Sequence, residues 1–165
     1  MQKSVKLVND RTYIYNELYQ LLEIYKNRPS DTLDEAYDNY EYKYLYDSLG
    51  RQESEQYFEY MNDTRTEKKR QEFIYNDIGM LAQVEITDNT GAIEKISTEN
   101  YIYNSGGQRF IKTYTDSDNQ KHMTRYLYSG TEVIMTVDSA SMKKTENVLD
   151  LSGQIIVSQR FDVNG

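Results

Sequence analysis

Short stretches in which bulky apolar residues alternate recur along the chain between groups of polar turn formers. In the clearest of them, Tyr101-Ile102-Tyr103-Asn104, residues two apart on a strand point to one face, so the two tyrosines share a face and Ile102 has the other. The Asn104 side chain can hydrogen-bond the backbone two residues ahead, and Gly107 can adopt the positive φ that closes a turn. The pattern predicts a β-hairpin with residues 108–114 as its return strand.

The same order of aromatic residue, aliphatic residue, Tyr, and Asn or Asp occurs four times. The copies are Tyr13-Ile14-Tyr15-Asn16, Tyr44-Leu45-Tyr46-Asp47, Phe73-Ile74-Tyr75-Asn76 and Tyr101-Ile102-Tyr103-Asn104. A glycine stands three residues after the Asn or Asp at Gly50, Gly79 and Gly107, where the first copy has Tyr19. The starts at 13, 44, 73 and 101 are separated by 31, 29 and 28 residues, a spacing typical of one small supersecondary unit per repeat.

Two degenerate copies follow near residues 126 and 147. One is Tyr126-Leu127-Tyr128-Ser129-Gly130, and the other keeps Asp150 and Gly153 but has no aromatic residue. Residues 80–86 and 153–161 are expected to be further return strands. Together the copies predict a mainly β fold, in which antiparallel hairpins of tandem repeats form a twisted open sheet as a single domain over residues 1–165.

Three segments leave local alternatives open. Residues 17–26 place several apolar side chains at helical spacing, which favours a short helix there: Leu18, Leu21, Leu22 and Tyr25. Residues 31–39 offer Asp31 as a helix N-cap. Residues 64–72 are polar and charged throughout and could instead be an extended hairpin connection.

Composition narrows the classes of partner. The chain has 17 Tyr, 4 Phe and no Trp, and tyrosine suits half-exposed sheets because its ring packs while its hydroxyl meets water. A net charge of −8 argues against nucleic acid as a partner. The one basic cluster, Lys68-Lys69-Arg70, is surrounded by acidic residues, and we expect it to be a solvated turn or strand end and not an anion site.

No export or membrane segment is visible in the sequence. Residues 1–10 lack the continuous apolar stretch of a signal peptide, and no run approaches the roughly 20 apolar residues that span a bilayer. We therefore expect a soluble chain without a membrane span. An export signal would have to lie on sequence outside these residues, with Met1 inside a longer gene.

Candidate catalytic and metal-binding residues are weak. His122 is the single histidine and has no nucleophile motif beside it, so we expect a surface residue. The carboxylates of Asp34, Glu35 and Asp38 have no spacing that singles out an acid and base pair. We predict no enzymatic activity and no cofactor.

Residues 116–120 begin like a calcium loop, with oxygen ligands at alternate positions. Such a loop needs Gly at its sixth position and Glu at its twelfth, where this chain has Lys121 and Leu127. A polar hairpin turn is the better interpretation, and no metal site is predicted. Residues 88–91, Asp-Asn-Thr-Gly, predict a turn for the same chemical reasons.

The segment Tyr44-Leu45-Tyr46-Asp47-Ser48-Leu49-Gly50-Arg51 resembles the signature of the YD-repeat, or Rhs, family. The resemblance covers residues 11 to about 162. It implies a β-sheet ribbon that coils into a hollow shell, as in bacterial polymorphic toxins, insecticidal toxin complexes and animal teneurins. It also implies a scaffold role, with the rest of a larger shell or a fused toxin domain as partner.

The chain departs from this family pattern in several places. Tyr19 replaces the first glycine, Arg51 is the one arginine that directly follows a motif glycine, and Arg109 is shifted by one place. The toxin shells end in a self-cleavage motif with Asp-Pro, whereas the single proline here is Pro29. Fewer than seven repeats are too few to close a shell, so we expect an open strip or fragment.

Two functions follow from these observations. The first is a non-catalytic repeat scaffold within a larger secreted or cell-surface protein. The alternative is a module that binds carbohydrate or protein, such as a cell-surface glycan, through exposed rows of tyrosines. The alternative is favoured if the tyrosines outside the motifs gather on one exposed face: Tyr37, Tyr40, Tyr42, Tyr57 and Tyr60.

Overall fold

A computed structural model describes residues 4–8, 11–26, 40–61, 64–150 and 152–162, and within these ranges it contains strands and no helix. The thirteen described strands are β1 Ser4–Val8, β2 Arg11–Tyr15, β3 Leu21–Lys26, β4 Tyr40–Tyr46, β5 Gln52–Met61, β6 Thr64–Tyr75, β7 Leu81–Asp88, β8 Lys95–Tyr103, β9 Arg109–Thr115, β10 Lys121–Ser129, β11 Glu132–Asp138, β12 Lys143–Leu149 and β13 Ile155–Asp162.

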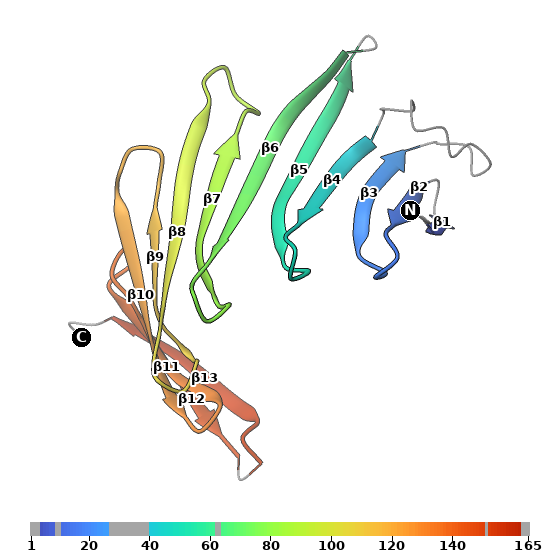
Figure 1. Cartoon of the computed structure of the whole chain (residues 1–165). Coiled ribbons are helices and arrows are strands. Elements are labelled where there is room, and N and C mark those ends of the chain that lie inside the picture. The colour runs from blue at the N-terminus through green and yellow to red at the C-terminus, as the bar shows by residue number, and fades with distance from the viewer. Residues whose placement is uncertain (1–3, 9–10, 27–39, 62–63, 151, 163–165) are drawn as a thin grey trace. The chain divides into compact units, whose positions relative to one another are not determined.

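The strands are hydrogen-bonded in chain order from β1 to β13, and short turns join β2 to β3, β4 to β5, β6 to β7 and β8 to β9 (Figure 1). Pairing is antiparallel from β1 to β6 and from β8 to β13. The predicted fold class, a mainly β open sheet of antiparallel hairpins, is confirmed. The four complete motifs end β2, β4, β6 and β8, and the degenerate copies lie on β10 and β12.

Two compact units make up the chain. The first contains residues 1–74 and 85–96, and the second contains residues 75–84 and 97–165. The division crosses β6, β7 and β8. Each motif turn described below lies wholly within one unit.

The alternative of a short helix at residues 17–26 is wrong. Residues 16–20 form a turn and residues 21–26 are β3, which pairs with β2 on one side and β4 on the other. The helical spacing of the leucines does not produce a helix here. Pairing with a strand on each side gives the backbone N–H and C=O groups of β3 their hydrogen-bond partners. The possible helix at 31–39 lies outside the described residues.

The charged segment at residues 64–72 is likewise a strand and not a connection. It forms most of β6 and pairs with β5 from Met61–Thr64 to Ser54–Glu72. Cross-strand polar contacts support it, since Gln56 Nε2 donates to Glu67 Oε2 at 2.7 Å. Lys68, Lys69 and Arg70 therefore lie within a strand, and their expected place at a turn or strand end is wrong.

The core of the first unit is small. Ile14, Tyr25 and Phe58 are buried and form one cluster, with exposed fractions of 2%, 3% and 8%. Thr12 is paired with Tyr25 across β2 and β3, so the two share a face, and Thr12 is also buried. In the second unit Val84 is buried.

The aliphatic residue of the motif is buried in the first copy alone. Ile14 is 2% exposed, whereas its equivalents are about half exposed: Leu45, Ile74, Ile102, Leu127 and Val148. A single sheet normally buries at least one face against another layer. The described part of the chain does not supply such a layer over these side chains. It also contains no helix long and apolar enough to span a membrane.

Candidate functional site

The turn at Asn104 has the geometry from which the repeat is built. The Gly107 N–H donates to the Asn104 carbonyl at 3.0 Å, and the Asn104 N–H donates to the Gln108 carbonyl at 2.9 Å. The Asn104 Oδ1 accepts the N–H groups of Gly106 and Gln108 at 2.9 and 3.0 Å. Gly107 has a φ of 77°, which an L side chain rarely adopts. One amide side chain thus satisfies two backbone donors of the loop.

Five further turns of the described chain share this set of bonds. They open at Asn16, Asp47, Asn76, Asp116 and Asp150. Glycine has the positive φ at Gly50, Gly79 and Gly153, as at Gly107, but Tyr19 has a φ of 59° and Asn119 a φ of 60°. The first turn therefore forms without glycine, and the calcium-like segment at 116–120 is a turn of the same type.

The degenerate copy at Tyr126 turns differently. Ser129 pairs directly with Glu132, which leaves Gly130 and Thr131 as a two-residue loop, and Gly130 has a φ of 61°. Serine replaces the Asn or Asp in this copy. In the longer turns the Asn or Asp side chain accepts two N–H groups inside the loop. The two-residue loop does not have these inner N–H groups, so this copy does not need Asn or Asp.

Four of the motif turns touch the next turn through the residue that follows them. Gln20 Nε2 donates to the Gly50 carbonyl at 2.8 Å, and Gln108 Nε2 donates to the Gly130 carbonyl. The same position has Met80, whose Sδ would lie 3.9 Å from a Cβ on Gly107, and Glu132, whose Cγ would lie 3.4 Å from a Cβ on Gly153. Sequence reasoning missed this contact, although the position after each turn could have been compared between copies.

The second tyrosine of the motif also joins neighbouring repeats. Its hydroxyl donates to the carbonyl of the second residue after the preceding motif turn, at 2.8–2.9 Å: Tyr46 to Leu21, Tyr103 to Leu81 and Tyr128 to Arg109. The last copy has no tyrosine, and Asn147 Nδ2 donates to the equivalent carbonyl of Val133 at 2.8 Å. The predicted motif residues are therefore used both within turns and between repeats.

Arg51, the residue that matches the family signature, pairs with its own turn. Its Nε lies 2.7 Å from Asp47 Oδ2, and its N–H donates to Asp47 Oδ1 at 2.9 Å. Partial burial would raise the pKa of the Asp47 carboxyl, but these bonds from Arg51 and the Leu49 N–H outweigh it and lower that pKa. Hydrogen bonds from Ser152 and Gln154 likewise lower the pKa of Asp150.

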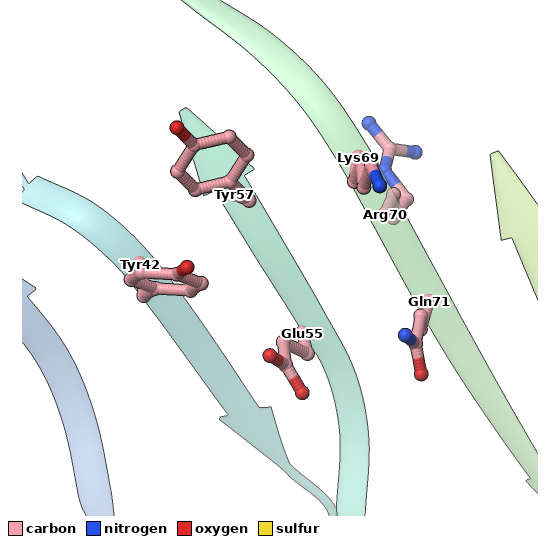
Figure 2. A pocket seen from close by; sticks show the side chains of 6 residues that line it. All are labelled: Tyr42, Glu55, Tyr57, Lys69, Arg70 and Gln71. Atoms are coloured by element: carbon pink, nitrogen blue, oxygen red, sulfur yellow. The ribbon is translucent and has the colours of Figure 1, made fainter. Parts of the chain in front are cut away.

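A shallow hollow of about 290 Å³ lies on one face of β4, β5 and β6. Strand register explains its lining. Tyr42, Tyr57 and Lys69 form one cross-strand row, and Tyr44, Glu55 and Gln71 form the next row on the same face. The Tyr42 and Tyr57 rings are 5.1 Å apart and tilted by 39°. Figure 2 shows both rings in one row, with Glu55 and Gln71 in the other.

Two polar side chains of this hollow have no hydrogen-bond or ion-pair partner in the part of the chain that the structure describes. Glu55 and Gln71 make no side-chain hydrogen bond or ion pair among the described residues. Lys69 Nζ is 3.9 Å from Asp88 Oδ2 and is half exposed. Arg70 also lines the hollow, but its guanidinium is held by Glu67 at 3.0 Å. Burial raises the pKa of the Tyr44 hydroxyl to about 12, and the Glu55 charge adds to this.

Two of the tyrosines outside the motifs lie together on one face of the sheet. Tyr42 and Tyr57 lie together on the hollow's face, whereas alternation along β5 puts Tyr60 on the opposite face with Phe58. Tyr37 and the side chain of Tyr40 lie outside the described part. The exposed tyrosine row expected by the binding hypothesis is thus a pair.

His122, the single histidine, is not among the residues that line this hollow. His122 is 40% exposed, lies beside the Tyr114 ring and has its Nε2 3.8 Å from Asp116 Oδ2. Asp34, Glu35 and Asp38 lie outside the described residues. Within the described ranges no group of three or more His, Cys, Asp or Glu side chains could hold a metal ion.

Comparison with known proteins leaves the family open. No protein-family model matches the chain, and no curated protein matches it. Among solved structures, the chain is similar to a porin-like protein from Bacteroides uniformis ATCC 8492, with 10% identity and a TM-score of 0.26. That match covers 96% of this chain and 74% of the other. A TM-score this low carries no argument about fold or function.

Proposed function

We propose that the chain is a non-catalytic structural segment of a YD-repeat array, belonging to the shell or stalk of a larger secreted or cell-surface protein. The observation that carries the proposal is the contact that four of the motif turns make with the next turn, through the residue after the turn. In two of these contacts the side-chain amide donates a hydrogen bond to the glycine carbonyl: Gln20 to Gly50 and Gln108 to Gly130. In repeat arrays, stability comes largely from such nearest-neighbour contacts.

The exposed surfaces of the sheet support a role within a larger assembly. Every residue of β13 is exposed, including Ile155, Ile156 and Phe161. An apolar edge strand offers unpaired backbone groups to another strand and invites aggregation unless it is covered. The half-exposed aliphatic residues of the motifs likewise need a covering layer. Both surfaces suit an array that continues in space.

The side chain of Gln154 indicates where a further repeat would pack. It follows the turn at Asp150 and so occupies the position of Gln20 and Gln108, but its side chain has no hydrogen bond in the described part of the chain. A further motif strand beside β13 would bring a turn glycine to Gln154. Its second tyrosine would reach the carbonyl of Ile155, the second residue after the turn.

An extended chain tests this arrangement. Residues 95–115, which contain β8, its turn and β9, are duplicated after Gly165 in the full chain. We expect the melting temperature to rise, and the β13 amides that face away from β12 to exchange with solvent at least about tenfold more slowly. Gln154→Ala should then lower the stability of the extended chain more than that of the original chain.

The control is an extension of the same composition in scrambled order. Equal protection of β13 by the scrambled extension, or an equal effect of Gln154→Ala in both chains, would contradict the proposal. A separate measurement addresses location: an antibody against this chain should detect a protein larger than 19.5 kDa in the culture medium or at the cell surface. Detection only inside the cell would rule out the secreted role.

A further inference from the structure

The hollow on β4, β5 and β6 combines aromatic rings with unpartnered polar groups. The rings of Tyr42 and Tyr57 form its upper row with Lys69, and Glu55 and Gln71 lie one row along the same face (Figure 2). The scaffold role uses none of these side chains. We propose that this hollow binds one neutral hexopyranose ring, as a free sugar or at the end of a glycan.

Size and shape favour a single ring. The hollow measures about 290 Å³, whereas sites for drug-sized ligands occupy about 300–1,000 Å³. Neighbouring strands are about 4.8 Å apart, so three strands and two rows make a patch of one-ring width. A pyranose has an apolar C–H face that packs on an aromatic ring, and hydroxyls around its edge. The ring of Tyr57, central in its row, would contact that face.

The polar groups match the hydroxyls of such a sugar. The Glu55 carboxylate accepts hydrogen bonds, Lys69 donates them, and the Gln71 amide does both. Neither Glu55 nor Gln71 has a hydrogen bond or ion pair to another described side chain, so a ligand need not displace a protein partner. The hydroxyls of the sugar would thus meet Glu55 and Gln71, which are free, and Lys69, whose ion pair with Asp88 is long at 3.9 Å.

The balance of charge favours a neutral ligand. Glu55 in the hollow opposes an anionic ligand, and Lys69 and Arg70 oppose a cationic one. The net charge of the chain, −8, further disfavours an anion at long range. A sugar without carboxylate or amine groups meets neither repulsion.

NMR titration of the full chain tests the site. The probes are the methyl glycosides of glucose, galactose, mannose and N-acetylglucosamine, added to tens of millimolar because a one-ring site has a Kd of about 1 mM or weaker. We expect amide shifts confined to β4, β5 and β6 with at least one of them. Tyr57→Ala and Glu55→Gln should each weaken binding about tenfold or abolish it, and Tyr57→Phe should retain it.

Matched controls separate this site from general stickiness. Tyr114→Ala removes a half-buried tyrosine from β9, far from the hollow in sequence, and should leave the affinity unchanged. Methyl glucuronide, choline and cyclohexanol should bind more weakly than the neutral sugar. Stronger binding of any of these three, the absence of shifts with every glycoside, or unchanged affinity in both Tyr57→Ala and Glu55→Gln would overturn the proposal. None of these outcomes bears on the repeat array.

Discussion

The side-chain amide of Gln20 donates a hydrogen bond of 2.8 Å to the carbonyl of Gly50, the glycine of the next motif turn. Gln20 Oε1 also accepts a bond from Asn16 Nδ2 at 2.7 Å, so one side chain ties its own turn to the next. Comparable contacts recur at three later turns. The following expectations test the turns and their coupling.

Removing the coupling side chain should destabilise the fold. Gln20→Ala loses two hydrogen bonds and should cost about 1–2 kcal/mol in urea unfolding. Gln20→Met should cost less, because Met80 occupies the equivalent position against Gly107. Gln120 follows a turn of the same type, but within the described residues its side chain makes one long hydrogen bond, to the Asp118 carbonyl at 3.5 Å, so Gln120→Ala should be near neutral. Equal losses at both glutamines would contradict the coupling.

Replacing Tyr19 should stabilise the protein. Its φ of 59° costs an L residue about 1–2 kcal/mol, and its side chain is 85% exposed, so little packing offsets the strain. After the entropy cost of glycine, Tyr19→Gly should gain about 0.5–1 kcal/mol. Leu18→Gly, one position earlier without positive φ, should instead destabilise. Thermal and urea melts distinguish the two results, and a loss in Tyr19→Gly would refute the strain.

Position decides the cost of replacing a turn glycine. A Cβ on Gly107 would meet only Met80 Sδ at 3.9 Å, so Gly107→Ala tests the φ of 77° alone and should cost about 1–2 kcal/mol. At Gly91 the φ is not positive and a Cβ would meet the Ile93 backbone at an ordinary contact distance of 3.8 Å, so Gly91→Ala should change stability by about 0.5 kcal/mol or less. Asn104→Ala should also destabilise, and the double mutant should cost less than the sum because both act on one turn. Strict additivity would mean that the two residues are independent.

Acid should weaken the turns that open with aspartate. The folded pKa of Asp47 is lowered, so its contribution is present above the unfolded value of about 4 and is lost as pH falls through the folded pKa. Asp47→Asn keeps the Oδ1 acceptor that Asn16, Asn76 and Asn104 use. We expect its melting temperature to fall less between neutral pH and pH 2 than that of the wild type. Parallel acid profiles of the two proteins would argue against this role.

High pH should destabilise the fold by ionising the Tyr44 hydroxyl. Burial raises its folded pKa to about 12, so its contribution to stability is present below the unfolded value of about 10 and is lost as pH rises towards 12. Absorbance at the phenolate band should show a late ionisation that Tyr44→Phe removes, and the variant should lose less stability above pH 10. An unchanged titration in Tyr44→Phe would assign the late step to another tyrosine.

The local pattern was enough to predict the motif strands, several of the return strands and most turns. Alternation in Tyr101-Ile102-Tyr103 and the pair of Asn104 with Gly107 are signals within a few residues, and they depend only on strand geometry and backbone sterics. At residues 17–26 the local signal failed, because helical spacing and strand pairing compete there. The neighbouring strands β2 and β4 decide the outcome.

The sequence by itself determined the period of the repeat, the antiparallel hairpins and the glycines that close most motif turns with a positive φ, since each is a property of short segments. Tertiary structure decided which turn touches which, that the Tyr46 hydroxyl reaches the Leu21 carbonyl, and that Tyr57 and Gln71 line one hollow. These contacts join residues 14–30 positions apart. They depend on the register and neighbours of whole strands, and hydrogen bonding across the sheet sets both.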